Sequence, residues 1–148
     1  MPNGPTHRVA GGVAGGGLAL ARATGQPPEA VLIEVFGGVV GGVVGGRLPD
    51  IFDPATTPRH RSTAHSALAG LVVVGAALED ARSYCRERAD TYRRLKAQSG
   101  LNDGARLWYA LLELVWQFLA GALTGLQAGY VSHLALDALT PAGLPLLG

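Results

Sequence analysis

Residue types that bind metal ions are concentrated in a few short stretches of this 148-residue chain. Residues 47–66 hold two aspartates and two histidines between apolar segments, and three prolines interrupt any helix through the first half of this stretch. His133 precedes Asp137 by four residues, a spacing that places both side chains on one face of a helix. Imidazole nitrogen and carboxylate oxygen together suit Zn²⁺, and also Mn²⁺ or Fe²⁺. The candidate metal ligands are His7, Asp50, His65, His133 and Asp137.

Three further residues of the same stretch are candidate catalytic residues: Asp53, His60 and Arg61. Asp53 suits a general base or a carboxylate that orients a ligand histidine, and Arg61 suits a clamp on a phosphate group. The alternative is that these three residues only order the loop through hydrogen bonds, and that His133 is a buried histidine with satisfied hydrogen bonds. Ser66 could be read as a nucleophile, but a polar contact at the start of a helix is the favoured interpretation.

The elements that would position these residues are long apolar segments, predicted at residues 9–24, at 30–46, from about 62 to 98, and from about 105 to the proline at 141. Hydrophobic residues make up 48% of the chain and charged residues 16%, below the roughly 25% of an average soluble protein. Glycines recur every four residues over 37–45 and again over 38–46, which is typical of membrane helices in close contact. Such faces also suit contacts between copies of the chain, as in a homo-oligomer.

We therefore predict an all-α fold, a four-helix up-down membrane bundle formed by one domain over residues 1–148. The alternative is a soluble all-α domain. Alternating helix directions bring His7, the 47–66 stretch and His133 to one end of the bundle. A charged helical hairpin extension between helices 3 and 4, residues 79–106, falls at the opposite end, and we call it the arm. The net charge of +1 gives no basic field for nucleic acid, so no nucleic-acid partner is expected.

Charge also predicts the orientation of the bundle and the surroundings of two carboxylates. Eight Lys and Arg residues fall at the arm end and four at the histidine end, which predicts a cytoplasmic arm under the positive-inside tendency. Glu34 and Glu113 lie inside apolar segments near the arm end. A charge in hydrocarbon is costly, so we expect both to point inward or to snorkel toward the arm-side surface, and at least one to pair with Arg22 or Arg106.

Five motifs resemble one known family, the YdjM-like inner-membrane proteins, described as predicted membrane-bound metal-dependent hydrolases. The motifs are Thr6-His7, Leu48-Pro49-Asp50-Ile51-x-Asp53, His60-Arg61-Ser62-x-x-His65-Ser66, His133-x-x-x-Asp137 and Thr140-Pro141-x-Gly143. They occur in order over nearly the whole chain, and the arm lies outside them. The resemblance implies an integral inner-membrane protein that hydrolyses its substrate with the help of a metal.

A more distant similarity is to the zinc-dependent phospholipase C and P1-type nuclease group, which is all-α. It implies that Asp50, His65, His133 and Asp137 hold one zinc ion, and that His7 and a bridging Asp137 help to hold a second. No histidine follows His133, so a third ion is not expected. The implied substrate is a phosphoester or the headgroup of a membrane lipid. Two other classes remain: a small membrane scaffold whose metal only ties helix ends together, and a partner-binding module that docks through its arm.

Overall fold

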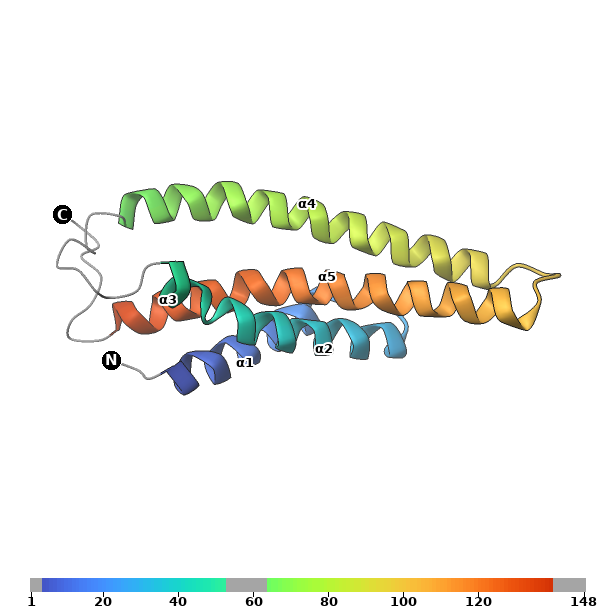
Figure 1. Cartoon of the computed structure of the whole chain (residues 1–148), viewed down its shortest axis with the longest axis horizontal. Helices are drawn as coiled ribbons and strands as arrows, with labels where there is room; N and C mark the ends of the chain where they lie inside the picture. Colours follow the sequence, from blue (N-terminus) through green and yellow to red (C-terminus); the bar gives the residue numbers. More distant parts are fainter. Residues whose placement is uncertain (1–3, 53–63, 140–148) are drawn as a thin grey trace.

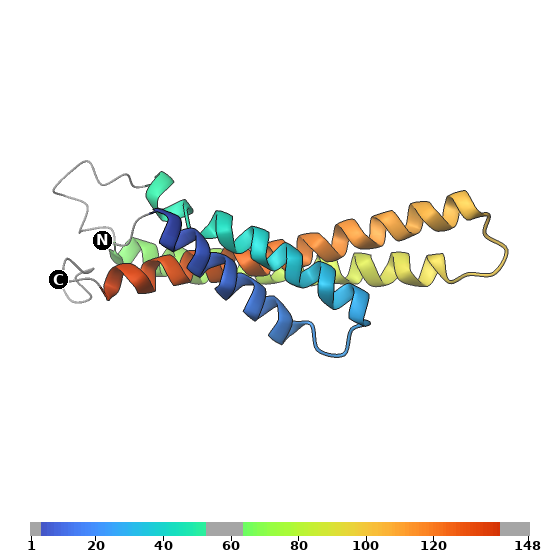
Figure 2. The ribbon, with the colours of Figure 1, turned by 90° about the horizontal axis from the view of Figure 1, so that it is seen from below.

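Five α-helices make up the fold in the computed structural model, which describes residues 4–52 and 64–139 (Figure 1). They are α1 (Gly4–Arg22), α2 (Pro28–Gly45), α3 (Leu48–Phe52), α4 (Ala64–Lys96) and α5 (Asp103–Ala138). The four long helices alternate in direction, and the far ends of α4 and α5 extend as a hairpin beyond the turn between α1 and α2 (Figures 1 and 2). The predicted all-α up-down bundle with a charged extension is confirmed.

The central element is α5, which contacts α1, α2, α3 and α4. Its start is defined by Asn102, whose side chain accepts a hydrogen bond of 2.8 Å from the backbone N–H of Ala105, as an N-cap residue does. Pro28 opens α2, at a position where the missing N–H of proline costs no helical hydrogen bond. The two turns at the arm end use glycine where φ is positive, at Gly25 (80°) and Gly100 (86°).

Two rows of glycine on α2 set its distances to its neighbours. A Cβ on any glycine of the first row would overlap a backbone carbonyl oxygen of α5, and these glycines are Gly37, Gly41 and Gly45. The second row, Gly38, Gly42 and Gly46, faces backbone atoms of α1 in the same way. The glycine spacing therefore predicted real helix contacts, because only a residue without a side chain lets the backbones approach so closely.

The interior of the bundle is small and polar, and large apolar side chains lie outside. Among the described residues, the largest fully buried side chains are His133, Gln117, Glu34 and Thr124. The buried hydrophobic residues are five alanines and Cys85. By contrast, Val13, Leu32, Phe36 and Leu107 are 60–71% exposed. This distribution is the reverse of a soluble core and fits a protein whose outer surface is covered by lipid.

Two helices of the described chain are long and apolar enough to cross a membrane, Pro28–Ile51 and Asp103–Ala138. Four spanning segments were expected from the sequence. With a rise of 1.5 Å per residue, the 36 residues of α5 measure about 54 Å, well beyond the hydrocarbon thickness of about 30 Å. The excess length of α5 belongs to the arm.

The short helix α3 corrects the expectation that prolines prevent helix formation in the 47–66 stretch. Pro49 is the second residue of α3, in the first turn, where no intrahelical hydrogen bond needs its N–H. A further bond from Ile51 N–H to the carbonyl of Arg47, 3.2 Å long, helps to close this turn. The result is a single helical turn that carries Asp50 directly after α2.

The two carboxylates within the apolar segments point inward as predicted, but their predicted partners are wrong. Glu34 is 1% exposed and receives two hydrogen bonds of 2.9 Å from Arg86. Glu113 is 7% exposed and is bonded by Arg93 at 2.8 Å and by Lys96 at 2.6 Å. All three cations come from α4, which runs beside α5 for most of its length, so their long side chains reach over both carboxylates.

Arg22, one of the expected partners, instead pairs with Glu79 at 2.7 Å. Its backbone carbonyl accepts a bond of 2.9 Å from Arg86. Glu79 also accepts two hydrogen bonds from Arg82, and these bonds lower the pKa of the Glu79 carboxyl. In the described chain, α4 is thus joined to α1 and α2 through arginine side chains.

Candidate metal centre

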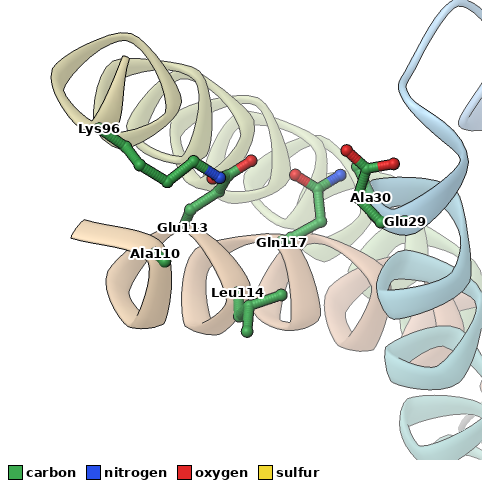
Figure 3. A pocket seen from close by; sticks show the side chains of 7 residues that line it. All are labelled: Glu29, Ala30, Lys96, Ala110, Glu113, Leu114 and Gln117. Atoms are coloured by element: carbon green, nitrogen blue, oxygen red, sulfur yellow. The ribbon is translucent and has the colours of Figure 1, made fainter. Parts of the chain in front are cut away.

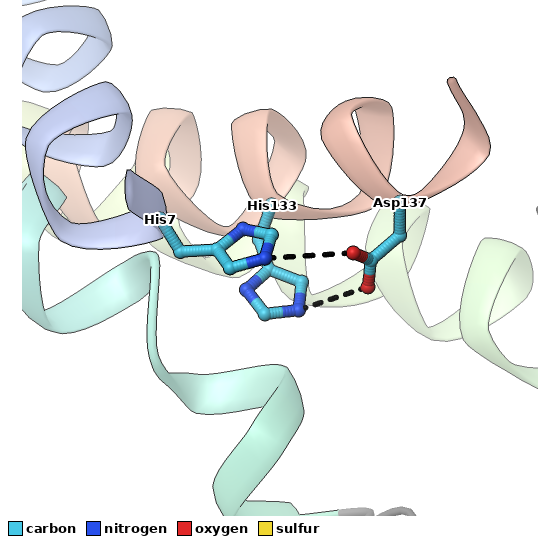
Figure 4. Close-up of side chains that lie close together, drawn as sticks. All are labelled: His7, His133 and Asp137. Carbon is cyan, nitrogen blue, oxygen red and sulfur yellow. Dashed lines mark ion pairs between the residues drawn. The ribbon is translucent and has the colours of Figure 1, made fainter. Parts of the chain in front are cut away.

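Three separate helices bring two histidines and two aspartates together at one end of the bundle, and Figure 4 shows His7, His133 and Asp137 of this cluster. His7 lies in the first turn of α1, Asp50 on α3, and His133 and Asp137 one turn apart near the end of α5. The Nε2 atom of His7 is 3.5 Å from Oδ1 of Asp137, and Nε2 of His133 is 3.2 Å from Oδ2 of the same carboxylate. Nε2 of His133 is also 3.5 Å from Oδ1 of Asp50.

A backbone carbonyl sets the tautomer of the neutral His133 ring. Its Nδ1 lies 2.8 Å from the carbonyl oxygen of Gly46, which can only accept a hydrogen bond. Nδ1 is therefore the N–H donor in the neutral ring, and Nε2 carries the lone pair. Nε2 is the atom that faces Asp50 and Asp137. Metal-binding histidines are commonly oriented in this way: one ring nitrogen donates a hydrogen bond to a backbone carbonyl, and the other nitrogen binds the ion.

His7 is held by stacking rather than by a hydrogen bond at its second nitrogen. Its ring lies on the ring of His133 with 3.9 Å between centroids and an interplanar angle of 24°. The side chain is buried, and its Nδ1 has no hydrogen-bond partner among the described residues. The two imidazoles therefore direct their Nε2 atoms to different oxygens of the one carboxylate between them, that of Asp137 (Figure 4).

The separations fit a metal centre better than direct ion pairs. Hydrogen bonds between imidazolium and carboxylate measure about 2.7–2.9 Å, shorter than the 3.2–3.5 Å found here. Ligand atoms about 2.0–2.1 Å from a tetrahedral Zn²⁺ lie roughly 3.3 Å apart. One ligand atom from each of His7, His133 and Asp137 falls within 4.8 Å of the others. The donor set, two nitrogens and a carboxylate, is also one that zinc uses at catalytic sites.

One side of the cluster is buried and the other is open. The side chains of His7 and His133 are 4% and 2% exposed, whereas Asp137 is 35% and Asp50 is 61% exposed. A substrate could reach a metal ion bound to the histidines from the side on which the two aspartates lie. This asymmetry distinguishes the cluster from a fully enclosed structural site.

The structure brings together four of the five predicted metal ligands: His7, Asp50, His133 and Asp137. The fifth, His65, belongs to the first turn of α4, and its side chain lies outside the described residues. The three candidate catalytic residues, Asp53, His60 and Arg61, also lie outside them.

Two groups of the polar interior were not identified from the sequence, the carbonyl of Gly46 and the side chain of Gln117. The carbonyl of Gly46 anchors His133, and no residue pattern identifies a backbone acceptor in advance. Gln117 is 1% exposed and donates a bond of 3.1 Å to Glu34. It sits four residues after Glu113 on the same face of α5, a spacing that could have marked it as part of a polar stripe.

A bundle with lipid-facing apolar side chains, two candidate spans and a His/Asp cluster at one end is a helical membrane protein with a candidate metal centre. The family model described as YdjM inner membrane protein matches residues 1–148. The chain therefore belongs to the YdjM family and is an inner membrane protein. Comparisons with curated proteins and with solved structures gave no match.

Proposed function

We propose that this protein is a membrane-bound metal-dependent hydrolase that acts on a phosphoester, such as a lipid headgroup, at the end of the bundle that carries the histidines. The observation that supports the proposal most is the open side of the cluster. Buried His7 and His133 would hold the ion, and the exposed carboxylate of Asp50 would border the side from which a substrate enters. A purely structural zinc site would instead be closed by four protein ligands.

Each residue of the site has a separate role in the proposed reaction. In the neutral ring, the Gly46 carbonyl keeps the proton of His133 on Nδ1, so that Nε2 offers its lone pair to a cation. Asp137 faces both histidines and can serve one ion or bridge two. When bound, a divalent metal such as Zn²⁺ supplies Lewis acidity, which polarises a phosphoester and lowers the pKa of water toward neutrality. We assign proton transfer to Asp53 and phosphate binding to Arg61, as the sequence predicts, and His60 is a further candidate catalytic residue.

The orientation that we propose places the arm in the cytoplasm and the metal centre at the opposite face of the membrane. It is supported by the eight Lys and Arg residues at the arm end against four at the other. A hydrolase in this orientation would meet headgroups of the outer leaflet.

Metal content and hydrolysis, measured separately, test the proposal. The full-length protein, purified in detergent, is analysed for bound zinc and assayed on a chromogenic phosphodiester and on phospholipid. Asp137→Asn and His133→Ala should each lower zinc content at least tenfold, in line with the loss of a ligand. Asp103→Asn is the matched control, since it also converts an aspartate of α5 to asparagine, at the other end of the bundle.

The outcomes separate binding from catalysis. Zinc retained by both site variants would refute the metal centre. Zinc bound stoichiometrically without any hydrolysis would favour a scaffold in which the ion only ties α1, α3 and α5 together. Hydrolysis that falls together with zinc in the site variants, and persists in Asp103→Asn, supports the proposed function.

A further inference from the structure

A second polar site lies at the arm end of the bundle, far from the histidines. A cavity of about 160 Å³ opens between α2, α4 and α5. Its polar lining comes from Glu29, Lys96, Glu113 and Gln117, and its apolar wall comes from Ala30, Ala110 and Leu114 (Figure 3). At about 30 Å³ per water, it has room for roughly five waters or one small polar group.

Two acceptors in this cavity lack partners in the part of the chain that the structure describes. Gln117 is 1% exposed, and its Oε1 receives no hydrogen bond there. Its Nε2 donates a hydrogen bond of 3.1 Å to the Glu34 carboxylate, so turning the amide round would place its oxygen against that carboxylate. Glu29, in the first turn of α2, forms no ion pair with the described residues.

The other charged groups make the cavity dipolar. Glu113 is neutralised by Arg93 and Lys96. The ammonium of Lys96 uses one of its three N–H groups for this bond and has two left. Figure 3 shows Glu29 and Lys96 at opposite ends of the cavity, with Glu113 and Gln117 between them. The lining therefore offers a free negative charge at Glu29, a cationic donor at Lys96, and between them the Oε1 acceptor of Gln117.

The cavity lies at the depth of the membrane surface. Glu29 is the second residue of α2, the helix that begins the first candidate span. Gln117 lies 21 residues before the end of α5 at Ala138, or about 30 Å at 1.5 Å per residue, which matches the hydrocarbon thickness. With Ala138 taken as the opposite face of the membrane, the groups that line the cavity lie where phospholipid headgroups end and acyl chains begin.

We propose that this cavity binds the zwitterionic headgroup of a phospholipid with a primary ammonium, such as phosphatidylethanolamine. The ammonium has three N–H donors, enough for the carboxylate of Glu29 and Oε1 of Gln117. The phosphate lies toward Lys96, and the start of the acyl chains lies against Leu114. A quaternary ammonium, as in phosphatidylcholine, has no N–H to donate and leaves Oε1 of Gln117 unsatisfied, which is costly for a buried carbonyl.

Thermal unfolding of the full-length protein in detergent tests this site, because a ligand that binds only the folded state raises the unfolding midpoint as its concentration rises. The probes are phosphatidylethanolamine, phosphatidylcholine with the same acyl chains, and soluble phosphoethanolamine. We expect a saturable rise with phosphatidylethanolamine, little with phosphatidylcholine, and a rise with phosphoethanolamine only at much higher concentration. Glu29→Gln should weaken the phosphatidylethanolamine response about tenfold, the usual effect of losing a charged hydrogen bond.

Asp103→Asn is the matched control, because Asp103 is also an exposed acid in the first turn of a helix but does not line the cavity. Gln117→Met removes Oε1 and should also weaken binding. If that variant fails to fold, Glu29→Gln still decides, since Glu29 is exposed. Equal responses to the two lipids, or an unchanged response in Glu29→Gln, would overturn the site. If phosphoethanolamine stabilised the protein at the same concentrations as the lipid, the site would still bind an ammonium group, but its ligand would not be a membrane lipid.

Discussion

Replacing Gly41 with alanine tests the contact that determines how α2 and α5 fit together. A Cβ at this position would lie 2.8 Å from the carbonyl carbon and 2.9 Å from the Cα of Ala122, and it would overlap the Ala122 carbonyl oxygen. Carbon atoms in favourable contact are about 3.5–4.0 Å apart, so the helices must separate by about 1 Å. All these neighbours are backbone atoms, which cannot move aside alone as a flexible side chain could.

Moving α2 and α5 apart costs more free energy than alanine gains over glycine in helix propensity. Overpacking of this kind costs about 1–3 kcal/mol, while alanine gains about 1 kcal/mol over glycine within a helix. Moving the helices apart also loosens the contacts of Gly37 and Gly45 one turn away on either side. We therefore expect Gly41→Ala to lower the free energy of unfolding by about 1–2 kcal/mol.

Gly17→Ala is the matched control in α1. A Cβ there would meet nothing within 4 Å, so only the propensity gain remains, up to about 1 kcal/mol. The two variants should then differ by about 2–3 kcal/mol, or roughly 5–10 °C in unfolding midpoint for a chain of this size. Thermal unfolding in detergent measures both. Equal midpoints would show that α2 and α5 do not approach as closely as the structure has them.

Two further predictions concern the arm end. Arg86→Met should destabilise the protein by about 3–5 kcal/mol, because it leaves the buried carboxylate of Glu34 unpaired, whereas Arg88→Met, on the exposed face of α4, should change little. Denaturant unfolding measures the free energy of unfolding of both variants. Equal values would mean that the buried carboxylate of Glu34 does not need its partner on α4. A fluorescent reporter inserted into the turn at residues 99–104 should be active in the cytoplasm, as the distribution of Lys and Arg predicts. Periplasmic activity of that reporter would reverse the proposed orientation.

The sequence predicted the main architecture because its signals were local and repeated. Glycine at every fourth position specified two contact faces of α2, and one face turns out to meet α5 and the other α1. Alternating helix directions then brought His7 and His133 to the same end without any knowledge of side-chain geometry. Periodicity and connectivity together were sufficient for this level of the structure.

The partners of the buried carboxylates could not be predicted in the same way. Proximity to the helix ends favoured Arg22 and Arg106 for Glu34 and Glu113, yet both carboxylates are bonded by side chains of α4. An arginine reaches several ångströms from its backbone, so its partner depends on how α4 lies across the bundle rather than on depth along one helix. The turn of α3 was missed for a different reason, since a proline at the start of a helix is compatible with it.

Gly46 links the packing of the helices to the candidate metal centre. A Cβ on this residue would lie 2.5 Å from the backbone carbonyl oxygen of His7, so the absence of a side chain sets how closely the start of α1 approaches the end of α2. The carbonyl of the same residue accepts the hydrogen bond from Nδ1 of His133, at 2.8 Å. One glycine therefore positions His7 through its bare Cα and His133 through its carbonyl oxygen. The stacked imidazoles, whose ring centroids are 3.9 Å apart, are both on side chains of residues that contact Gly46. Close packing of α1 against α2 and the geometry of the histidines are thus one structural feature, and the glycine rows that build the bundle also build its site.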